Sequence, residues 1–352
     1  MNKSMGQVMT PKTLASRAVA LKQNNGRVLE PSSGTGVFLD LLPSAQGIEL
    51  DQTLVKSEHA HRVTVADFFS VIPDERFETI IGNPPYVCAK NNSRGKTVTH
   101  RVKQELSSAT LPPAANLYLR FIERCFRELL TKHGELIFIV PLEFFHVTSA
   151  AKLREEMLKH GSFTDVWFQI HDEWEASVEV CVFRYQKGIV GLRPRRDGVL
   201  CHEVTKDGCT FFMAQRPIAF LGDFFDTTVG ARPRKTNVHT VPAPGLIEFG
   251  SNKGSRWCSL NEPWPRSKRP MPGAKILFEE GPTRKGPYFV PSDCDRFLSC
   301  AMLPKRPGLD LQKWADFLEN YDGWEELNIR VSGRWRVGPR LIGAVPLTRL
   351  PE

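Results

Sequence analysis

Residues 28–39 read VLEPSSGTGVFL, and this stretch decides the fold that the sequence predicts. It joins a short apolar strand to the start of a helix through a turn that holds Gly34 and Gly36. Glycines at such a turn adopt positive φ and let a ligand approach the backbone closely. The third glycine of a dinucleotide fingerprint is absent and no GxxxxGK followed by Ser or Thr is present, so pyrophosphate binding is disfavoured. The stretch indicates an α/β domain with a small adenosine-like ligand at one edge of its sheet.

Two acids follow at the ends of the next two predicted strands. Glu49 lies in GIELD, thirteen residues after Gly36, where a carboxylate can accept hydrogen bonds from both hydroxyls of a ribose. Asp67, in VADFF, can accept from an exocyclic amine while Phe68 packs on the purine ring. A single GxG turn is more often structural, and a single acid after a strand is more often a helix cap or a solvated side chain. Three such features after three consecutive strands favour a nucleoside cofactor.

Residues 81–86 read IGNPPY and follow the fourth predicted strand, so they lie at the same edge of the sheet. Two prolines fix φ and donate no hydrogen bond, which leaves a stiff loop whose backbone presents acceptors only. The Asn83 amide oxygen and the Pro84 carbonyl can both accept from one NH2 group. They then favour a pyramidal nitrogen with a localised lone pair, which stabilises the transition state of an amine attack. Tyr86 offers a flat face on which the ring that carries the amine can stack. The alternative, purely structural interpretation of the tetrad is a rigid turn that closes a strand.

Short apolar runs alternate with helical patterns up to residue 187, which predicts a mostly parallel sheet with helices on both faces. The clearest helix is expected at residues 116–132, because apolar residues recur every four positions and Gly134 follows as a stop. Beyond residue 187 Pro and Gly become frequent, so a domain of residues 1–190 and a second, loop-rich domain of residues 200–352 are expected, with a helix near residues 311–320. The predicted strands are residues 27–29, 47–50, 63–65, 79–81, 135–140, 165–170 and 178–185.

Composition narrows the class of protein. A chain of 352 residues that is 41% hydrophobic can bury two cores. No apolar run approaches the roughly 18 to 20 residues of a membrane span, and the N-terminus lacks a secretory signal, so a soluble, cytoplasmic protein is expected. The eight cysteines form no CxxC pair and show no ligand-like spacing with histidine. Neither a metal site nor a disulfide framework is therefore expected.

The excess positive charge lies in one segment. The formal net charge is +8, and residues 231–290 hold eleven Lys and Arg against four Asp and Glu, a net charge of +7. A localised basic patch suggests a polyanionic partner, although basic surfaces without a nucleic-acid role are common.

These motifs, in this order, resemble the adenine-N6 DNA methyltransferases of restriction-modification systems. The resemblance covers roughly residues 5 to 187, with GQVMTP, EPSSGTGVFL, GIELD, VADFF and IGNPPY in sequence, and it fits the gamma-type subgroup, whose cofactor motifs precede the catalytic motif. It implies a Rossmann-like domain dependent on S-adenosylmethionine and a C-terminal domain that recognises the DNA target.

The resemblance also implies a role for individual residues. Catalysis is expected at Asn83, Pro84 and Tyr86. Contacts with S-adenosylmethionine are expected at Thr10, Glu30, Pro31, Ser32, Ser33, Gly34, Gly36, Glu49, Asp67, Phe68 and Asn83.

One position departs from the pattern of the family. A second aromatic residue that stacks on the extruded adenine is common before the strand at residues 178–185, and the nearest aromatic there is Trp174, which aligns only with a gap of one residue. Trp174 is thus a candidate beside Tyr86, and the alternative is a half-buried core tryptophan. Cys88 is interpreted as structural, because a cytosine-C5 mechanism needs a Pro-Cys nucleophile and Val87 precedes it.

Double-stranded DNA is the expected partner, with a cognate restriction endonuclease as a functional one and no membrane. A base amine cannot reach the site from inside a duplex, so flipping of the target base is implied. Three alternatives stay open: methylation of an RNA base amine (N6 of adenine or N2 of guanine), methylation of a protein glutamine amide, and a non-catalytic DNA-binding specificity subunit. The candidate phosphate contacts, some of which could read guanine, are Arg232, Arg234, Lys235, Arg256, Arg266, Lys268, Arg269, Arg284 and Lys285.

Overall fold

The structure is a computed structural model that forms two compact units, each treated by itself. The first comprises Met1–Glu203 with Thr210–Ala214, and the second comprises Val204–Cys209 with Gln215–Glu352. The residues that the structure describes are 9–72, 74–87, 108, 110–168, 179–229, 246–251, 254–259, 273–279, 285–290, 299–324, 330–331, 334–335 and 338–351.

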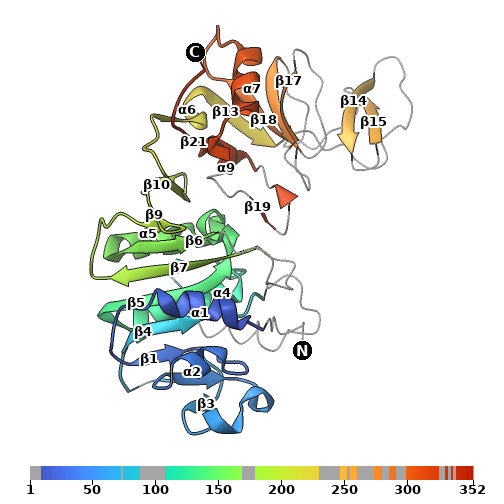
Figure 1. The fold of residues 1–352 in the computed structure, drawn as a ribbon. Coiled ribbons are helices and arrows are strands. Elements are labelled where there is room, and N and C mark those ends of the chain that lie inside the picture. The colour runs from blue at the N-terminus through green and yellow to red at the C-terminus, as the bar shows by residue number, and fades with distance from the viewer. Residues whose placement is uncertain are drawn as a thin grey trace. The chain divides into compact units, whose positions relative to one another are not determined.

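A nine-stranded mixed sheet organises the first unit, in the order β3-β2-β1-β4-β5-β7-β6-β8-β9 (Figure 1). The five strands from β3 to β5 are parallel, and β7 runs antiparallel between β5 and β6. The chain builds outward from β1 to β3 and then returns to β4 on the other side of β1, so the strand order reverses between β1 and β4. Ligands of open α/β sheets bind outside the carboxyl ends of the strands at such a reversal. The strands are β1 (Val28–Glu30), β2 (Gln46–Glu49), β3 (Val63–Val65), β4 (Phe77–Gly82), β5 (Leu130–Pro141), β6 (Gly161–Trp167), β7 (Val180–Lys187), β8 (Arg195–Arg196) and β9 (Val199–Leu200).

Helices cover both faces of this sheet, as predicted. One core joins α1 (Lys12–Ala20) and α2 (Val37–Leu41) to a strand face that includes Ile81 and Ile137. The other core joins α4 (Leu117–Arg124) and α5 (Ala151–His160) to the opposite face, which includes Ile80 and Leu136. Neighbouring strand residues thus enter different cores, which explains why the parallel strands read as continuous apolar runs. Short 3-10 turns occupy Gln52–Leu54, Ser57–His59, Leu142–Phe145 and Thr148–Ala150.

The helix predicted at residues 116–132 is shorter than expected. Its N-terminus is correct, because the Asn116 side chain accepts a hydrogen bond from the backbone of Tyr118. The α-helix ends at Arg124, a π-helical turn spans Cys125–Leu129, and β5 begins at Leu130. Leu130 is fully buried opposite Phe77, so the apolar periodicity ran on into the strand and hid the end of the helix.

Two hairpins were absent from the sequence prediction. Asp197 and Asp207 have positive φ, each is followed by a glycine with positive φ, and they turn the chain between β8 and β9 and between β10 (His202–Lys206) and β11 (Cys209–Met213). Asp-Gly is the typical pair for such a tight hairpin turn. The strands predicted at residues 165–170 and 178–185 are shifted to β6 and β7, with residues 169–178 outside the described part.

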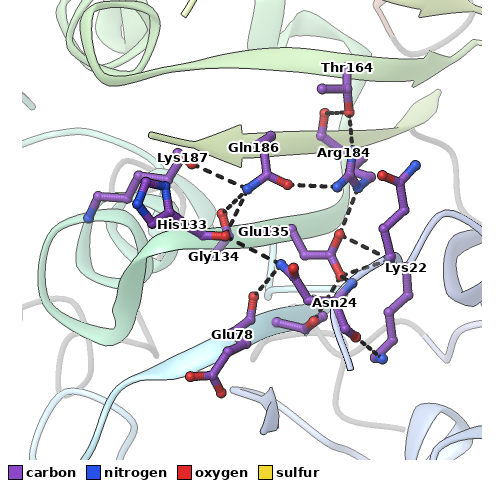
Figure 2. A network of polar contacts seen from close by, with 12 residues as sticks. Lys22, Asn24, Glu78, His133, Gly134, Glu135, Thr164, Arg184, Gln186 and Lys187 are labelled. Carbon is purple, nitrogen blue, oxygen red and sulfur yellow. Dashed lines mark hydrogen bonds and ion pairs between the residues drawn. The ribbon is translucent and has the colours of Figure 1, made fainter. Parts of the chain in front are cut away.

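A buried acid ties four segments together at the amino edge of β4 (Figure 2). The carboxylate of Glu135, which is fully buried, lies 2.7 Å from Nε of Arg184 and accepts from the Thr79 hydroxyl at 2.8 Å. It also accepts from the backbone amides of Gln23 at 3.0 Å and Asn24 at 2.9 Å. The loop between α1 and β1 is thereby fixed to β4, β5 and β7, at the edge opposite the carboxyl ends of β1 and β4.

The second unit contains a four-stranded antiparallel sheet in the order β13-β18-β16-β17. The predicted helix at residues 311–320 is confirmed as α7 (Leu311–Glu319), which starts where the Asp310 carboxylate accepts from the Lys313 backbone and buries Trp314 against Phe225. The other elements are β12 (Ala219–Phe220), α6 (Leu221–Phe224), β13 (Phe225–Val229), β14 (Leu246–Ser251), β15 (Gly254–Ser259), β16 (Lys275–Glu279), β17 (Lys285–Val290), β18 (Ser299–Pro304), β19 (Arg330–Val331), β20 (Arg334–Trp335), α9 (Pro339–Gly343) and β21 (Pro346–Leu347). No helix in the described part of the chain is long and apolar enough to cross a membrane.

Candidate functional site

The carboxyl ends of β1, β2 and β4 bring most of the predicted residues together. The backbone amide of Gly34, in the loop after β1, donates to Glu49 at the end of β2 at 2.7 Å. The Ser32 hydroxyl donates to the backbone carbonyl of Asn83 after β4 at 3.3 Å. Pro31 is buried, and its ring would be 3.4 Å from a Cβ at Gly82. The glycine loop, Glu49 and the NPPY tetrad therefore lie together at one edge of the sheet.

The two glycines of the loop have different surroundings. Gly36 has φ +81°, and a Cβ there would lie 2.5 Å from the ring of His59. Gly34 has φ +51°, and a Cβ there would meet nothing within 4 Å. Gly36 is thus required by the packing of His59 as well as by its conformation, whereas Gly34 borders open space.

Glu30 is the most deeply buried acid of the site, with 2% of its surface exposed. Its Oε2 atom and the Ser33 hydroxyl have no hydrogen-bond partner among the described residues. Burial raises the pKa of Glu30 well above its ordinary value, and the charge of Glu49 raises it further. Arg62 acts in the opposite direction and Asp40 in the same direction as Glu49. A buried carboxyl oxygen without a hydrogen-bond partner suits a ligand that brings a cationic group.

Glu49 and Asp67 are both engaged by backbone groups. One Glu49 oxygen accepts from Gly34 and the other from the Asp51 amide at 2.9 Å, which leaves a lone pair on each for a ligand hydroxyl. Asp67 accepts from the backbone of Phe69 at 3.0 Å and so caps its own turn. The ring of Phe68 is buried and stacked on Phe121, with centroids 4.4 Å apart. A role for Asp67 and Phe68 in adenine binding stays a prediction.

Asn83 is held at both ends of its amide. Its Nδ2 donates to the Thr10 hydroxyl at 3.0 Å, and its Oδ1 accepts from the Tyr86 hydroxyl at 2.6 Å. The same Tyr86 hydroxyl lies 3.1 Å from the backbone carbonyl of Ile139 on β5. Burial raises the pKa of Tyr86, with Cys181 and Tyr118 adding to the shift, so its hydroxyl stays protonated. Sequence reasoning missed Ile139, because a backbone acceptor leaves no signal in the side-chain type.

Several predicted residues lie outside the described part of the chain. Arg256 lies in β15 and Lys285 in β17, but their side chains are not among those that the structure describes. The others are Cys88, Trp174, Arg232, Arg234, Lys235, Arg266, Lys268, Arg269 and Arg284.

One group of side chains has the spacing of metal ligands within the described residues. Asp40, Glu58 and His59 offer ligand atoms within 4.8 Å of one another. The ammonium of Lys56 lies 2.9 Å from Asp40 and 3.7 Å from Glu58, and Asp40 raises the pKa of that ammonium. The positive charge at this cluster is therefore supplied by the chain itself, and we assign no metal to it.

Comparison with known proteins shows which proteins this chain resembles. Residues 40–171 match the family model described as Eco57I restriction-modification methylase. The type II methyltransferase M.TthHB8I of Thermus thermophilus is 33% identical over an alignment of 211 residues that covers 56% of this chain and 49% of that protein. The type II methyltransferase M.HincII of Haemophilus influenzae is 31% identical over an alignment of 199 residues that covers 53% of this chain and 38% of that protein. The chain thus spans about half the length of the first of these relatives and less of the second.

A solved structure extends the likeness beyond the first unit. The type IIL restriction-modification enzyme MmeI, solved in complex with DNA, matches 94% of this chain and 64% of its own chain, with a TM-score of 0.54 and 12% identity. At this identity the likeness concerns the fold alone. The predicted fold class, an α/β methyltransferase domain followed by a second part, is confirmed.

Proposed function

We propose, from the match of residues 40–171 to the Eco57I restriction-modification methylase model and from the two type II methyltransferases that the chain resembles, that it is a site-specific, adenine-specific DNA methyltransferase. In this proposal it transfers a methyl group from S-adenosylmethionine to the N6 amine of a flipped-out adenine in double-stranded DNA. The observation that carries the proposal is the Asn83 amide, fixed between Thr10 and Tyr86 directly beside the glycine loop. An uncharged acceptor at this place suits an amine that must be oriented rather than deprotonated.

The residues around the glycine loop fit S-adenosylmethionine. The cofactor supplies a methyl group on a sulfonium, and it carries an ammonium that can pair with Oε2 of Glu30, which has no hydrogen-bond partner among the described residues. Glu49 keeps lone pairs for the ribose hydroxyls, and the open side of Gly34 lets the ligand reach the backbone. Ser33 contributes a second unsatisfied polar atom in the same place. We assign cofactor binding to these residues and to Thr10, Pro31, Ser32, Gly36, Asp67, Phe68 and Asn83.

The target amine would be held by the NPPY tetrad. Pro84 is buried with its φ fixed, so its carbonyl and the Asn83 Oδ1 form a rigid pair of acceptors. Two acceptors placed out of the plane of the ring stabilise the pyramidal nitrogen of the attacking amine. The half-buried ring of Tyr86 provides a stacking surface for the base, and Trp174 is proposed as the second one.

The second unit would provide DNA affinity and target recognition through the basic segment of residues 231–290. Its proposed phosphate contacts are the nine Arg and Lys residues named from the sequence. A methyl mark in one short DNA sequence would protect host DNA from a cognate nuclease, which is the functional partner that we propose. Bacterial DNA lies in the cytoplasm, and the proposed reaction would take place there.

The deciding experiment is methylation of total bacterial DNA with S-adenosylmethionine, followed by single-molecule sequencing that detects N6-methyladenine. The proposal expects the mark within one short repeated sequence. Asn83→Ala should abolish turnover while DNA affinity stays within a few-fold, because the amide acts mainly in the transition state. Asn320→Ala, the same change at an exposed helix end, serves as the matched control and should keep full activity.

Other outcomes separate the alternatives. Cofactor binding without any DNA mark would make an RNA base amine the leading substrate, with a protein glutamine amide behind it. DNA binding without cofactor binding would favour a non-catalytic specificity subunit. Near-normal turnover of Asn83→Ala would sink the proposed mechanism.

A further inference from the structure

The Tyr86 hydroxyl has one proton and two acceptors. Asn83 Oδ1 lies 2.6 Å and the Ile139 carbonyl oxygen 3.1 Å from it, so only one of the two can accept its proton at a time. The shorter of the two distances, the one to Asn83, makes the amide oxygen the better acceptor in the free protein. The Ile139 carbonyl is a second position that the proton can reach without a large movement of the ring.

The two hydroxyls that clamp Asn83 differ in chemistry. The lone pair of a phenol is partly delocalised into its ring, so Tyr86 donates well and accepts poorly. The aliphatic hydroxyl of Thr10 accepts well. This pair therefore favours the amide orientation in which the oxygen faces Tyr86 and the nitrogen faces Thr10, as observed. The orientation matters, because only an oxygen can accept a hydrogen bond from a target amine.

The ring of Tyr86 is held while its hydroxyl exchanges partners. It packs edge-on against Tyr118, with centroids 5.9 Å apart and planes at 80°. It also contacts both hydrophobic cores of the first unit. A fixed ring restricts the hydroxyl to a rotation about its C–O bond, which moves the proton between the two acceptors.

We propose that the Tyr86 hydroxyl is a hydrogen-bond switch: it orients the Asn83 amide in the empty site and turns to the Ile139 carbonyl when a base amine binds Asn83 Oδ1. This role rests on the proposed function and is separate from stacking of the ring. Because the hydroxyl keeps a partner in both positions, arrival of the amine leaves no buried donor unsatisfied. Tyr86 is thus a positioning residue through its hydroxyl, and Thr10 is the fixed half of the same clamp.

The test replaces hydroxyls and keeps shapes. Tyr86→Phe retains the stacking ring, and Tyr118→Phe makes the same change in its neighbour, whose hydroxyl has no hydrogen-bond partner among the described residues. We expect Tyr86→Phe to lower kcat about tenfold with KM for DNA within about twofold, since the loss concerns orientation and not binding. Tyr118→Phe should change neither. Thr10→Val should lower kcat in the same way, and Thr10→Ser, which keeps the hydroxyl, should restore it.

A second readout needs neither DNA nor cofactor. The melting temperatures of Asn83→Ala, Tyr86→Phe and the double variant form a cycle, and the double variant should lose less than the sum of the two single losses. The switch is refuted by a Tyr86→Phe rate equal to or above that of the wild-type protein, or by additive losses in melting temperature. A wild-type protein that methylates no DNA would refute the proposed function alone. The cycle of melting temperatures would then still show whether the Tyr86 hydroxyl and the Asn83 amide are coupled.

Discussion

Glu30 holds the least favourable electrostatic position among the predicted site residues. Its carboxyl is buried beside a second acid, and one of its oxygens has no partner among the described residues. The resemblance to the methyltransferase family implied a cofactor contact at this residue, but the sequence could not show that it lies deeper than Glu49 or that Gly34 engages Glu49 and not Glu30. Those differences arise from how the loop folds back on itself.

The raised pKa of Glu30 predicts how stability depends on pH. An unfolded carboxyl ionises near 4.5, while the folded one retains its proton to higher pH. The stabilisation linked to this proton is complete below the unfolded pKa and is lost as pH rises through the folded pKa, at about 1.4 kcal/mol per pH unit. The unfolding free energy of Glu30→Gln, which cannot ionise, should therefore exceed that of the ligand-free wild-type protein by a margin that grows between pH 5 and pH 8.

Denaturant titrations across that pH range measure the margin. Glu155→Gln, at an exposed carboxyl, is the control and should show no growing difference. A margin for Glu30→Gln that stays constant with pH would mean that Glu30 is ionised in the folded protein.

The site shows what a motif can and cannot specify at the level of single residues. Thr10, Asn83 and Tyr86 lie 73 and 3 positions apart in sequence, and the structure joins them by hydrogen bonds as their motifs suggested. Phe68 was expected to pack on a purine ring. Its ring is stacked on Phe121, a contact that the sequence did not indicate, and its role in adenine binding stays a prediction.

At the level of elements, the apolar pattern of the sequence predicted where the strands of the sheet lie. It did not predict the boundary between two successive elements that share one apolar pattern. The stripe of α4 continues through the π-helical turn into Leu130, so no break in periodicity marks the end of the helix. The hairpin at Asp197 could have been predicted from its Asp-Gly pair. The antiparallel insertion of β7 between β5 and β6 depends on long-range pairing, which local periodicity does not encode.

The ion pair between Glu135 and Arg184 should be a major determinant of the stability of the first unit. Arg184→Met leaves a buried carboxylate without its charge partner, which typically costs about 3–5 kcal/mol. Chemical denaturation measures the loss. Lys159→Met breaks the exposed pair with Glu155 and should leave the unfolding free energy almost unchanged. Equal losses in the two variants would contradict a special role for the buried pair.

At the level of the whole molecule, the two compact units differ in how much of their function the sequence predicted. The first unit carries the motifs, and its site could be named residue by residue. The second carries the charge excess between residues 231 and 290. The strands of its four-stranded sheet show no recognisable alternation of apolar and polar residues in the sequence. Its strands are short, separated by proline-rich segments, and paired out of sequence order, so charge predicted a partner class but not a fold.

The basic segment makes a prediction about salt dependence. Changing Arg266, Lys268 and Arg269 together to Gln should weaken DNA binding and reduce the slope of log K against log salt by up to about 3, because each lost phosphate contact removes about 0.9. Binding measured by fluorescence anisotropy at several salt concentrations gives the slope. Gln at Lys152, Lys159 and Lys313, three exposed lysines elsewhere, is the control of equal charge change. An unchanged slope would show that the triplet does not touch phosphate.

The position of Arg184 has a consequence for how the protein is made on the ribosome. Glu135 meets the backbone of Gln23 and Asn24 and the side chain of Thr79, all of which are synthesised before it, but its only described cationic partner is synthesised 49 residues later. A nascent chain that ends before β7 would have to bury this acid uncompensated. We therefore expect the first unit to gain its native arrangement only after β7 has emerged from the exit tunnel.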